Sequence, residues 1–140
     1  MTSVVAAPAP ASASVRCLMA FDFGARRVGV AVGNTLLRQA QPLQTLALQG
    51  DARFAAIGAL LREWQPAALV VGVPFHPDGA AHENTLRARR FGRQLQGRFG
   101  LPVHEVDERY TTTEARAEGA ADVDAASAAV ILDQFLRSLP

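Results

Sequence analysis

Apolar residues occur in short continuous runs in the first third of the chain and at helical spacing further on. The runs at 17–24 and 28–33 flank the short segment 25–27, a spacing typical of a strand, a tight turn and an antiparallel partner. A third strand is expected to include Leu43, Thr45, Ala47 and Leu48. The chain therefore opens with three predicted strands.

Helices and strands then alternate. Apolar positions at helical spacing predict a helix that begins at Gly50 and ends at Pro66: Phe54, Ile57, Leu60, Leu61 and Trp64. The continuous apolar run 67–73 predicts a strand buried on both faces, and 81–99 predicts a second helix. A strand over 103–107 follows, then a short helix from the capping-box pattern 111–114 and a last helix that begins near 122–124.

The predicted order is three strands, helix, strand, helix, strand and two helices. This order predicts an α/β fold with a mixed five-stranded sheet flanked by helices, and it is closer to a ribonuclease-H-like arrangement than to a doubly wound Rossmann unit. With 140 residues and 49% hydrophobic content, one globular domain is expected over 16–140, preceded by a disordered Ala/Pro/Ser tail over 1–15.

Asp22 is the only charged residue within the first apolar run. An unpaired buried charge is strongly disfavoured, so Asp22 needs an arginine, a metal cation or backbone donors near it. Arg27, across the predicted turn, is the simplest structural partner. Glu108 follows the last predicted strand and Asp124 lies at the start of the last helix, so the fold can bring the three carboxylates together.

A cluster of three carboxylates suits Mg²⁺ or Mn²⁺, and two such ions can support hydrolysis of a phosphodiester. The small residues 125–128 would let the last helix lie close to the sheet. On sequence features alone, Glu108 is equally compatible with an exposed loop carboxylate, and Asp124 with a residue that caps the helix or interacts with its dipole.

The composition narrows the function classes. The net charge is +1 and the 14 basic side chains are all arginine, so contacts with nucleic acid would depend on local clusters, and Schiff-base or Walker-type lysine chemistry is excluded. The single cysteine, Cys17, is expected to be a buried apolar residue, and the histidines lack metal-ligand spacing. No segment is long enough to span a membrane, and a cytoplasmic location is expected.

Five motifs together resemble those of the YqgF family over residues 17–138. They are 22–31 (DFGARRVGVA), 71–74 (VGVP) with 78–79 (DG), 85–91 (TLRARRF), 107–112 (DERYTT) with 114–115 (EA), and 123–128 (VDAASA). The resemblance implies a ribonuclease-H-like fold and a nuclease active in ribosome biogenesis, through maturation of the 5′ end of pre-16S rRNA. It also implies that Asp22, Glu108 and Asp124 are catalytic carboxylates that bind the metal ions.

Structured nucleic acid, RNA more than DNA, is the expected partner of a monomer or homodimer. A Holliday junction resolvase and a weakly active, RNA-binding assembly factor stay open as alternatives. ATP binding at the Asp-x-Gly motif is disfavoured, because kinases with that motif use two domains. The segment 117–123 is shorter than the loop that the family often carries there, which leaves full activity in question.

Several arginines are candidates for binding the phosphate backbone. Arg89, Arg90 and Arg93 are predicted to project from the second helix, away from its apolar side. A solvated helix face would give the same pattern. Arg27 and Arg109 flank the carboxylates and could orient a phosphate, or they could form structural ion pairs.

Overall fold

One mixed sheet organises the chain. The computed structural model describes residues 15–76, 78–108 and 122–140. Its strands are β1 (Cys17–Phe23), β2 (Val28–Asn34), β3 (Ala40–Leu46), β4 (Ala68–Val73) and β5 (Val103–Asp107). Their order in the sheet is β3-β2-β1-β4-β5. The β1–β2 and β2–β3 pairs are antiparallel, whereas β1–β4 and β4–β5 are parallel, which confirms the predicted mixed five-stranded sheet.

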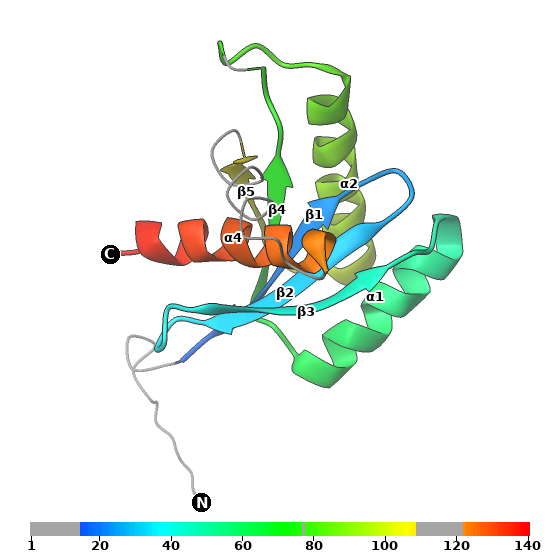
Figure 1. Cartoon of the computed structure of the whole chain (residues 1–140). Coiled ribbons are helices and arrows are strands. Elements are labelled where there is room, and N and C mark those ends of the chain that lie inside the picture. Colours follow the sequence, from blue (N-terminus) through cyan, green and yellow to red (C-terminus); the bar gives the residue numbers. More distant parts are fainter. Residues whose placement is uncertain (1–14, 77, 109–121) are drawn as a thin grey trace, which may run out of the picture.

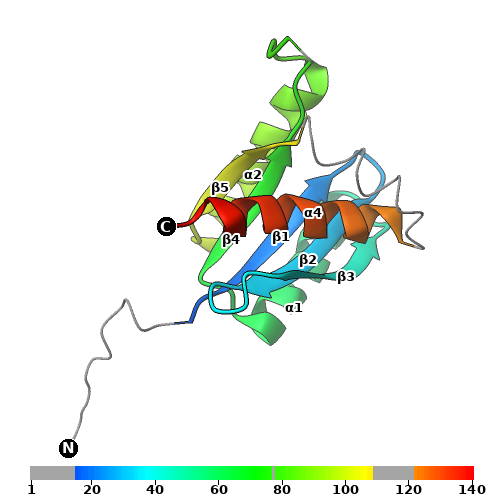
Figure 2. The same ribbon diagram turned by 60° about the vertical axis from the view of Figure 1, so that its left-hand side comes forward.

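Helices cover both faces of this sheet. Helix α4 (Val123–Ser138) crosses one face, while α1 (Gly50–Trp64) and α2 (Glu83–Phe99) lie on the other (Figures 1 and 2). Strand β1 shows the alternation that this layering requires. Met19 and Phe21 pack into the core on the α1 and α2 side, and Leu18 and Ala20 into the core beneath α4. Every residue of β4 is buried, as expected for a central parallel strand.

Two element boundaries in the structure differ from the predicted ones. Helix α2 begins at Glu83 rather than 81 because His82 caps it: the His82 side chain accepts a hydrogen bond from the Asn84 amide, and Thr85 Oγ1 accepts one from the His82 amide. Strand β3 covers Ala40–Leu46, so the expected strand residues Ala47 and Leu48 lie beyond its end. The Leu48 carbonyl accepts a hydrogen bond from Arg53 in α1 instead of pairing in the sheet.

The other boundaries agree with the sequence pattern. Helix α1 ends at Trp64, followed by Gln65 with φ 47° and then Pro66. Strand β5 covers the predicted residues, and α4 begins within the predicted window. The tail 1–14 and the short helix expected from 111–114 lie outside the described residues. Within the described part of the chain, no helix has both the length and the apolar character needed to cross a bilayer.

Candidate active site

The carboxyl ends of β1, β4 and β5 lie at one edge of the sheet because these three strands are parallel. Asp22 is two residues beyond Ala20, which packs beneath α4, so the pleat directs Asp22 to the α4 face. Glu108 is likewise two residues beyond Val106, another residue of the core beneath α4. The fold therefore brings two of the three predicted carboxylates to one end and one face of the sheet.

Gly72 in β4 provides the space that the Glu108 side chain occupies. A Cβ atom built on Gly72 would collide with Glu108 Oε2 and with Ile131 Cδ1 of α4. Glu108 Oε2 is shielded from solvent at this position. Glu108 is therefore a packed, partly buried residue, and the alternative of an exposed loop carboxylate is wrong.

Gly29 has the corresponding role on the other side of Asp22. It pairs directly with Asp22 across the β1–β2 hairpin, and a Cβ there would collide with the backbone of Asp124 in α4. The first turn of α4 thus lies directly on the sheet, next to the strand that carries Asp22. Ala128 and Ala129 continue this close contact by packing on Ala31 of β2, which confirms the predicted role of the small residues.

The start of α4 is anchored by Asp122 rather than by Asp124. Asp122 is the N-cap residue: its side chain accepts a hydrogen bond from the Ala125 amide at 3.1 Å. Thr45 of β3 donates a further hydrogen bond to Asp122 Oδ1. Asp124 is therefore not the N-cap, but it lies in the first turn of α4, where the helix dipole favours a carboxylate.

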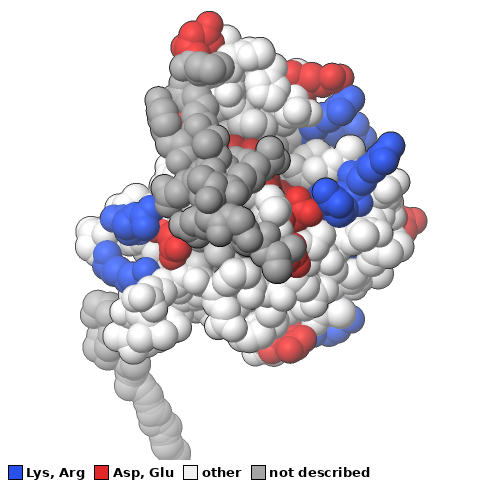
Figure 3. Space-filling view, viewed as in Figure 1, with Lys and Arg blue, Asp and Glu red and all other residues white. Residues whose placement is uncertain are grey.

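Arg27 contacts that carboxylate, with 3.0 Å between Arg27 Nε and Asp124 Oδ2. The Arg27 side chain is 64% exposed and that of Asp124 is 30% exposed, so water screens the pair. The sequence had suggested Arg27 as a partner for Asp22, but the ion pair in the structure joins it to Asp124. Figure 3 shows the face of the molecule that α4 covers, where acidic and basic side chains lie side by side at several places.

The donor set is chemically suited to a hard divalent cation, because Asp22, Glu108 and Asp124 offer carboxylate oxygens from three different elements. The recess above Gly72 supports that fit, since it holds a carboxylate oxygen away from solvent. Over residues 15–76, 78–108 and 122–140, however, no three His, Cys, Asp or Glu side chains are close enough to hold a metal.

A groove adjoins this edge between the β1–β2 hairpin and the end of β3. Its volume is about 470 Å³, and it is lined by Gly24, Arg26, Arg27, Ala47, Gln49 and Asp124. Arg26 and Arg27 are both exposed. The groove therefore offers guanidinium groups to an anion immediately beside the candidate carboxylates.

The other predicted arginines are not equivalent. Arg89 is partly exposed, and its guanidinium is occupied: it pairs with Glu105 at 3.2 Å and stacks on the Phe75 ring at 5.3 Å. Arg90 and Arg93 are exposed, as expected. Arg109 lies outside the described residues, as does most of the short segment before Asp124.

The chain matches one family over residues 16–138, RuvX, described as Holliday junction resolvase. The chain belongs to the RuvX family. This is the YqgF family that the motifs indicated. Two relatives carry the name "Putative pre-16S rRNA nuclease". The one from Albidiferax ferrireducens is 67% identical over 132 residues (94% of this chain, 85% of the relative), and the one from Polaromonas sp. is 66% identical over 129 residues (92% and 94%).

Solved structures with the same fold include RuvC from T. thermophilus in complex with a Holliday junction substrate. It has 15% sequence identity and a TM-score of 0.59, and the match covers 87% of this chain and 94% of RuvC. A second Thermus thermophilus RuvC structure matches at 13% identity with a TM-score of 0.52, over 87% and 95%. These similarities confirm the ribonuclease-H-like fold of this RuvX chain.

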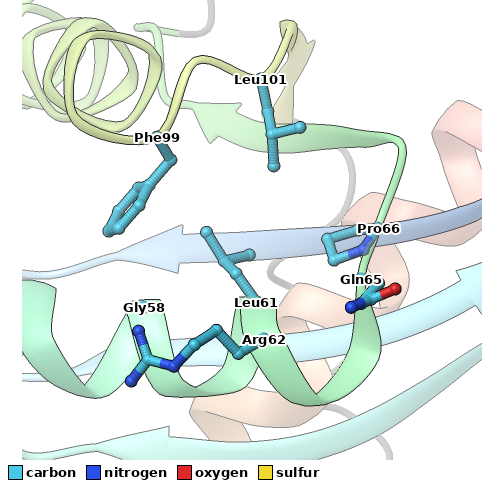
Figure 4. Close-up of a pocket in the computed structure, with 7 residues that line it drawn as sticks. All are labelled: Gly58, Leu61, Arg62, Gln65, Pro66, Phe99 and Leu101. Atoms are coloured by element: carbon cyan, nitrogen blue, oxygen red, sulfur yellow. The ribbon is translucent and has the colours of Figure 1, made fainter.

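Two further features of the RuvX chain lie away from the carboxylate edge. A depression of about 340 Å³ lies between the C-terminal ends of α1 and α2, with Leu61, Pro66, Phe99 and Leu101 among its lining residues (Figure 4). It adjoins the start of β4, whereas Glu108 contacts Gly72 near the other end of that strand. Cys17 is half-buried, and burial raises the pKa of its thiol, which favours the unreactive protonated form.

Arg53 is a residue that the sequence analysis missed. It is 5% exposed, in the first half of α1, and it donates hydrogen bonds to the carbonyls of Leu48, Gly24 and Ala25. Arg53 thereby fixes the hairpin turn that follows Asp22 and carries Arg27. A signal existed in the sequence, because Arg53 has the helical spacing that places it on the same side as Ile57 and Leu60 of the predicted helix.

Proposed function

We propose that this chain is a metal-dependent endonuclease that hydrolyses phosphodiester bonds, and that its substrate is the 5′ region of pre-16S rRNA. The single observation that carries the proposal is the placement of Asp22, Glu108 and Asp124 around two glycines at one end of the sheet. The names of the two relatives, each more than 60% identical to this chain, support the choice of substrate. A cytoplasmic location follows from that substrate.

Asp22 is the central ligand in this proposal, because it lies on the middle strand of the sheet between Gly29 and the strand that carries Gly72. Glu108 and Asp124 would complete the ligand set from either side. Mg²⁺ or Mn²⁺ held there, as one ion or two, would activate water and stabilise the leaving oxygen. The described residues supply no separate general base to the proposal.

Arg26 and Arg27 would hold the phosphate backbone in the groove beside Asp124. Arg27 is paired with Asp124 in the structure, and a guanidinium that loses its carboxylate partner to a cation becomes available to a phosphate. Metal binding and nucleic-acid binding would then favour each other.

A four-way DNA junction is the second candidate substrate, and the description of the RuvX family favours it. Cleavage of both substrates by the wild-type chain in Mg²⁺ or Mn²⁺ decides between them. We expect cleavage of a pre-16S rRNA fragment at its 5′ side and little cleavage of the junction. The reverse preference, with paired incisions by a homodimer, would instead support resolvase activity. Tight binding of the fragment without cleavage would contradict both and favour an assembly factor.

A further inference from the structure

A further pocket opens on the face of the sheet opposite α4, between α1, α2 and the end of β1. Its volume is about 240 Å³. It is lined by three arginines, three phenylalanines, one glutamine and one glycine: Arg53, Arg87, Arg90, Phe23, Phe54, Phe91, Gln94 and Gly50. The lining therefore contains no carboxylate, and its formal charge is positive.

Arg53 is the buried cation of this pocket. Three backbone carbonyls accept hydrogen bonds from its Nε and Nη2 atoms, and none of these acceptors carries a negative charge. No carboxylate within residues 15–76, 78–108 and 122–140 lies within 4.0 Å of its guanidinium. Burial lowers the pKa of Arg53, because the charged guanidinium loses contact with water. Since a buried charge is costly until it is paired, this site is prepared for an anion.

The groups around Arg53 add to this preference. Arg90 is exposed and, among the described contacts, takes no carboxylate partner, while Arg87 pairs with Glu83 at 2.9 Å at the surface. Gly50, at the start of α1, also lines the pocket, and the N-cap residue Gln49 makes no side-chain capping hydrogen bond. The positive end of the helix dipole therefore faces the same space as the arginines.

We propose that this pocket binds a phosphate group, with Arg90 and Arg87 contacting the phosphate and Arg53 supplying buried positive charge beneath it. Arginine suits this ligand because its planar fork matches phosphate geometry. The phenylalanine rings are consistent with a sugar or base next to that phosphate.

The most direct source of such a phosphate group is the backbone of the nucleic acid that the candidate active site would cleave. This assignment rests on the proposed function. Phe23 of the pocket follows Asp22 directly, and the turn between β1 and β2 lies at this end of the sheet (Figure 1). A strand that passes around this turn would meet Arg26 and Arg27 on one side and Arg90 on the other. A free mononucleotide presents the same chemistry and is the alternative source.

The first experiment tests the pocket without reference to cleavage. Thermal unfolding of the full chain is measured in inorganic phosphate and in chloride at equal ionic strength, for wild type, Arg90→Gln and Arg62→Gln. Arg62 is a matched control because it is also an exposed helix arginine but lies away from this pocket. We expect phosphate to raise the Tm of wild type and Arg62→Gln more than that of Arg90→Gln. An equal rise of the Tm in all three proteins would overturn the proposed phosphate site, and so would the absence of a rise in any of them.

The second experiment identifies the source of the phosphate. Affinity for a fluorescent pre-16S rRNA fragment is measured against salt in Ca²⁺, together with affinity for AMP. We expect Arg90→Gln to bind the RNA about eightfold more weakly at 0.1 M salt, the loss of one phosphate contact. Loss of AMP binding with unchanged RNA affinity would assign the pocket to a mononucleotide. An equal loss of RNA affinity in Arg62→Gln, the exposed arginine of α1 that lies away from this pocket, would overturn the proposed site in favour of diffuse charge.

The cleavage assay tests the proposed nuclease function independently of the phosphate pocket. If the fragment is not cleaved but phosphate still stabilises wild type more than Arg90→Gln, the proposed nuclease function fails and the pocket stands. If cleavage is observed and the phosphate effect is absent, the pocket fails and the nuclease function stands.

Discussion

Glu108 Oε2 lies in the space that a side chain at Gly72 would fill, so a carboxylate from one strand end rests on the neighbouring strand. Gly29, which pairs with Asp22, likewise leaves room for the backbone of Asp124, because a Cβ atom on Gly29 would collide with it. The two glycines thus set how closely the three candidate carboxylates approach. Their role at the site is steric, because both lie within regular strands and neither has a positive φ.

Gly72→Ala tests this relationship. The added methyl group must displace Glu108 or Ile131, and we expect a loss of about 1–3 kcal/mol in the free energy of unfolding, measured by urea denaturation. Gly97→Ala is the control, because a Cβ there has nothing within 4 Å. The control should be neutral or stabilised by up to about 1 kcal/mol. Equal stability of Gly72→Ala and wild type would show that the glycine is not needed for this packing.

Asp122→Ala tests the anchor of α4. Loss of the N-cap should cost about 1 kcal/mol of unfolding free energy and speed hydrogen exchange at the Ala125 amide, which donates to this cap. Asp122→Asn should retain most of the stability, since asparagine caps helices about as well as aspartate. A large loss of unfolding free energy in Asp122→Asn would mean that the first turn of α4 requires the negative charge of Asp122 and not only its capping hydrogen bond.

Arg53→Lys tests the support of the hairpin turn. A lysine keeps the charge but cannot donate to three carbonyls in the fixed geometry of a guanidinium, so we expect a loss of roughly 2 kcal/mol in unfolding free energy. Arg62→Lys, at an exposed position on the same helix, should change stability by less than about 0.5 kcal/mol. Similar stabilities for the two variants would contradict the structural role of Arg53.

Arg27→Gln separates two roles of Arg27. Because its pair with Asp124 is exposed, stability should change by less than about 1 kcal/mol. Mn²⁺ affinity, measured by calorimetry, should rise, because Asp124 no longer has to break its ion pair with Arg27 before it binds the cation. Affinity for RNA in Ca²⁺ should fall, because a phosphate contact is lost. Unchanged values for both affinities would show that the ion pair is only a surface contact.

The fold was largely predictable because apolar periodicity distinguishes the strands from the helices and because 67–73 is apolar on both faces. The candidate carboxylates were also identified from sequence. Their packing was not, since the partner of Gly72 is 36 positions away and is revealed only by the register of β4 and β5. Asp122 and Asp124 are both acceptable caps by residue type, and the backbone decides between them.

Arg53 shows a different limit. Its burial follows from backbone carbonyls at the β1–β2 turn and after β3, which no local pattern near Arg53 records. A charged residue on the apolar side of a predicted helix is nonetheless a useful signal, because it requires acceptors in the folded chain.

The central claim is that Asp22 is essential for metal-dependent cleavage. The most direct measurement compares cleavage of a pre-16S rRNA fragment in Mg²⁺ or Mn²⁺ by wild type, Asp22→Asn and the control Asp51→Asn, whose carboxylate is fully exposed and far along the chain in α1. Wild type and Asp51→Asn should cleave equally, while Asp22→Asn should lose about a thousandfold or more in rate and keep its Tm. Cleavage by a folded Asp22→Asn at the wild-type rate would contradict the account.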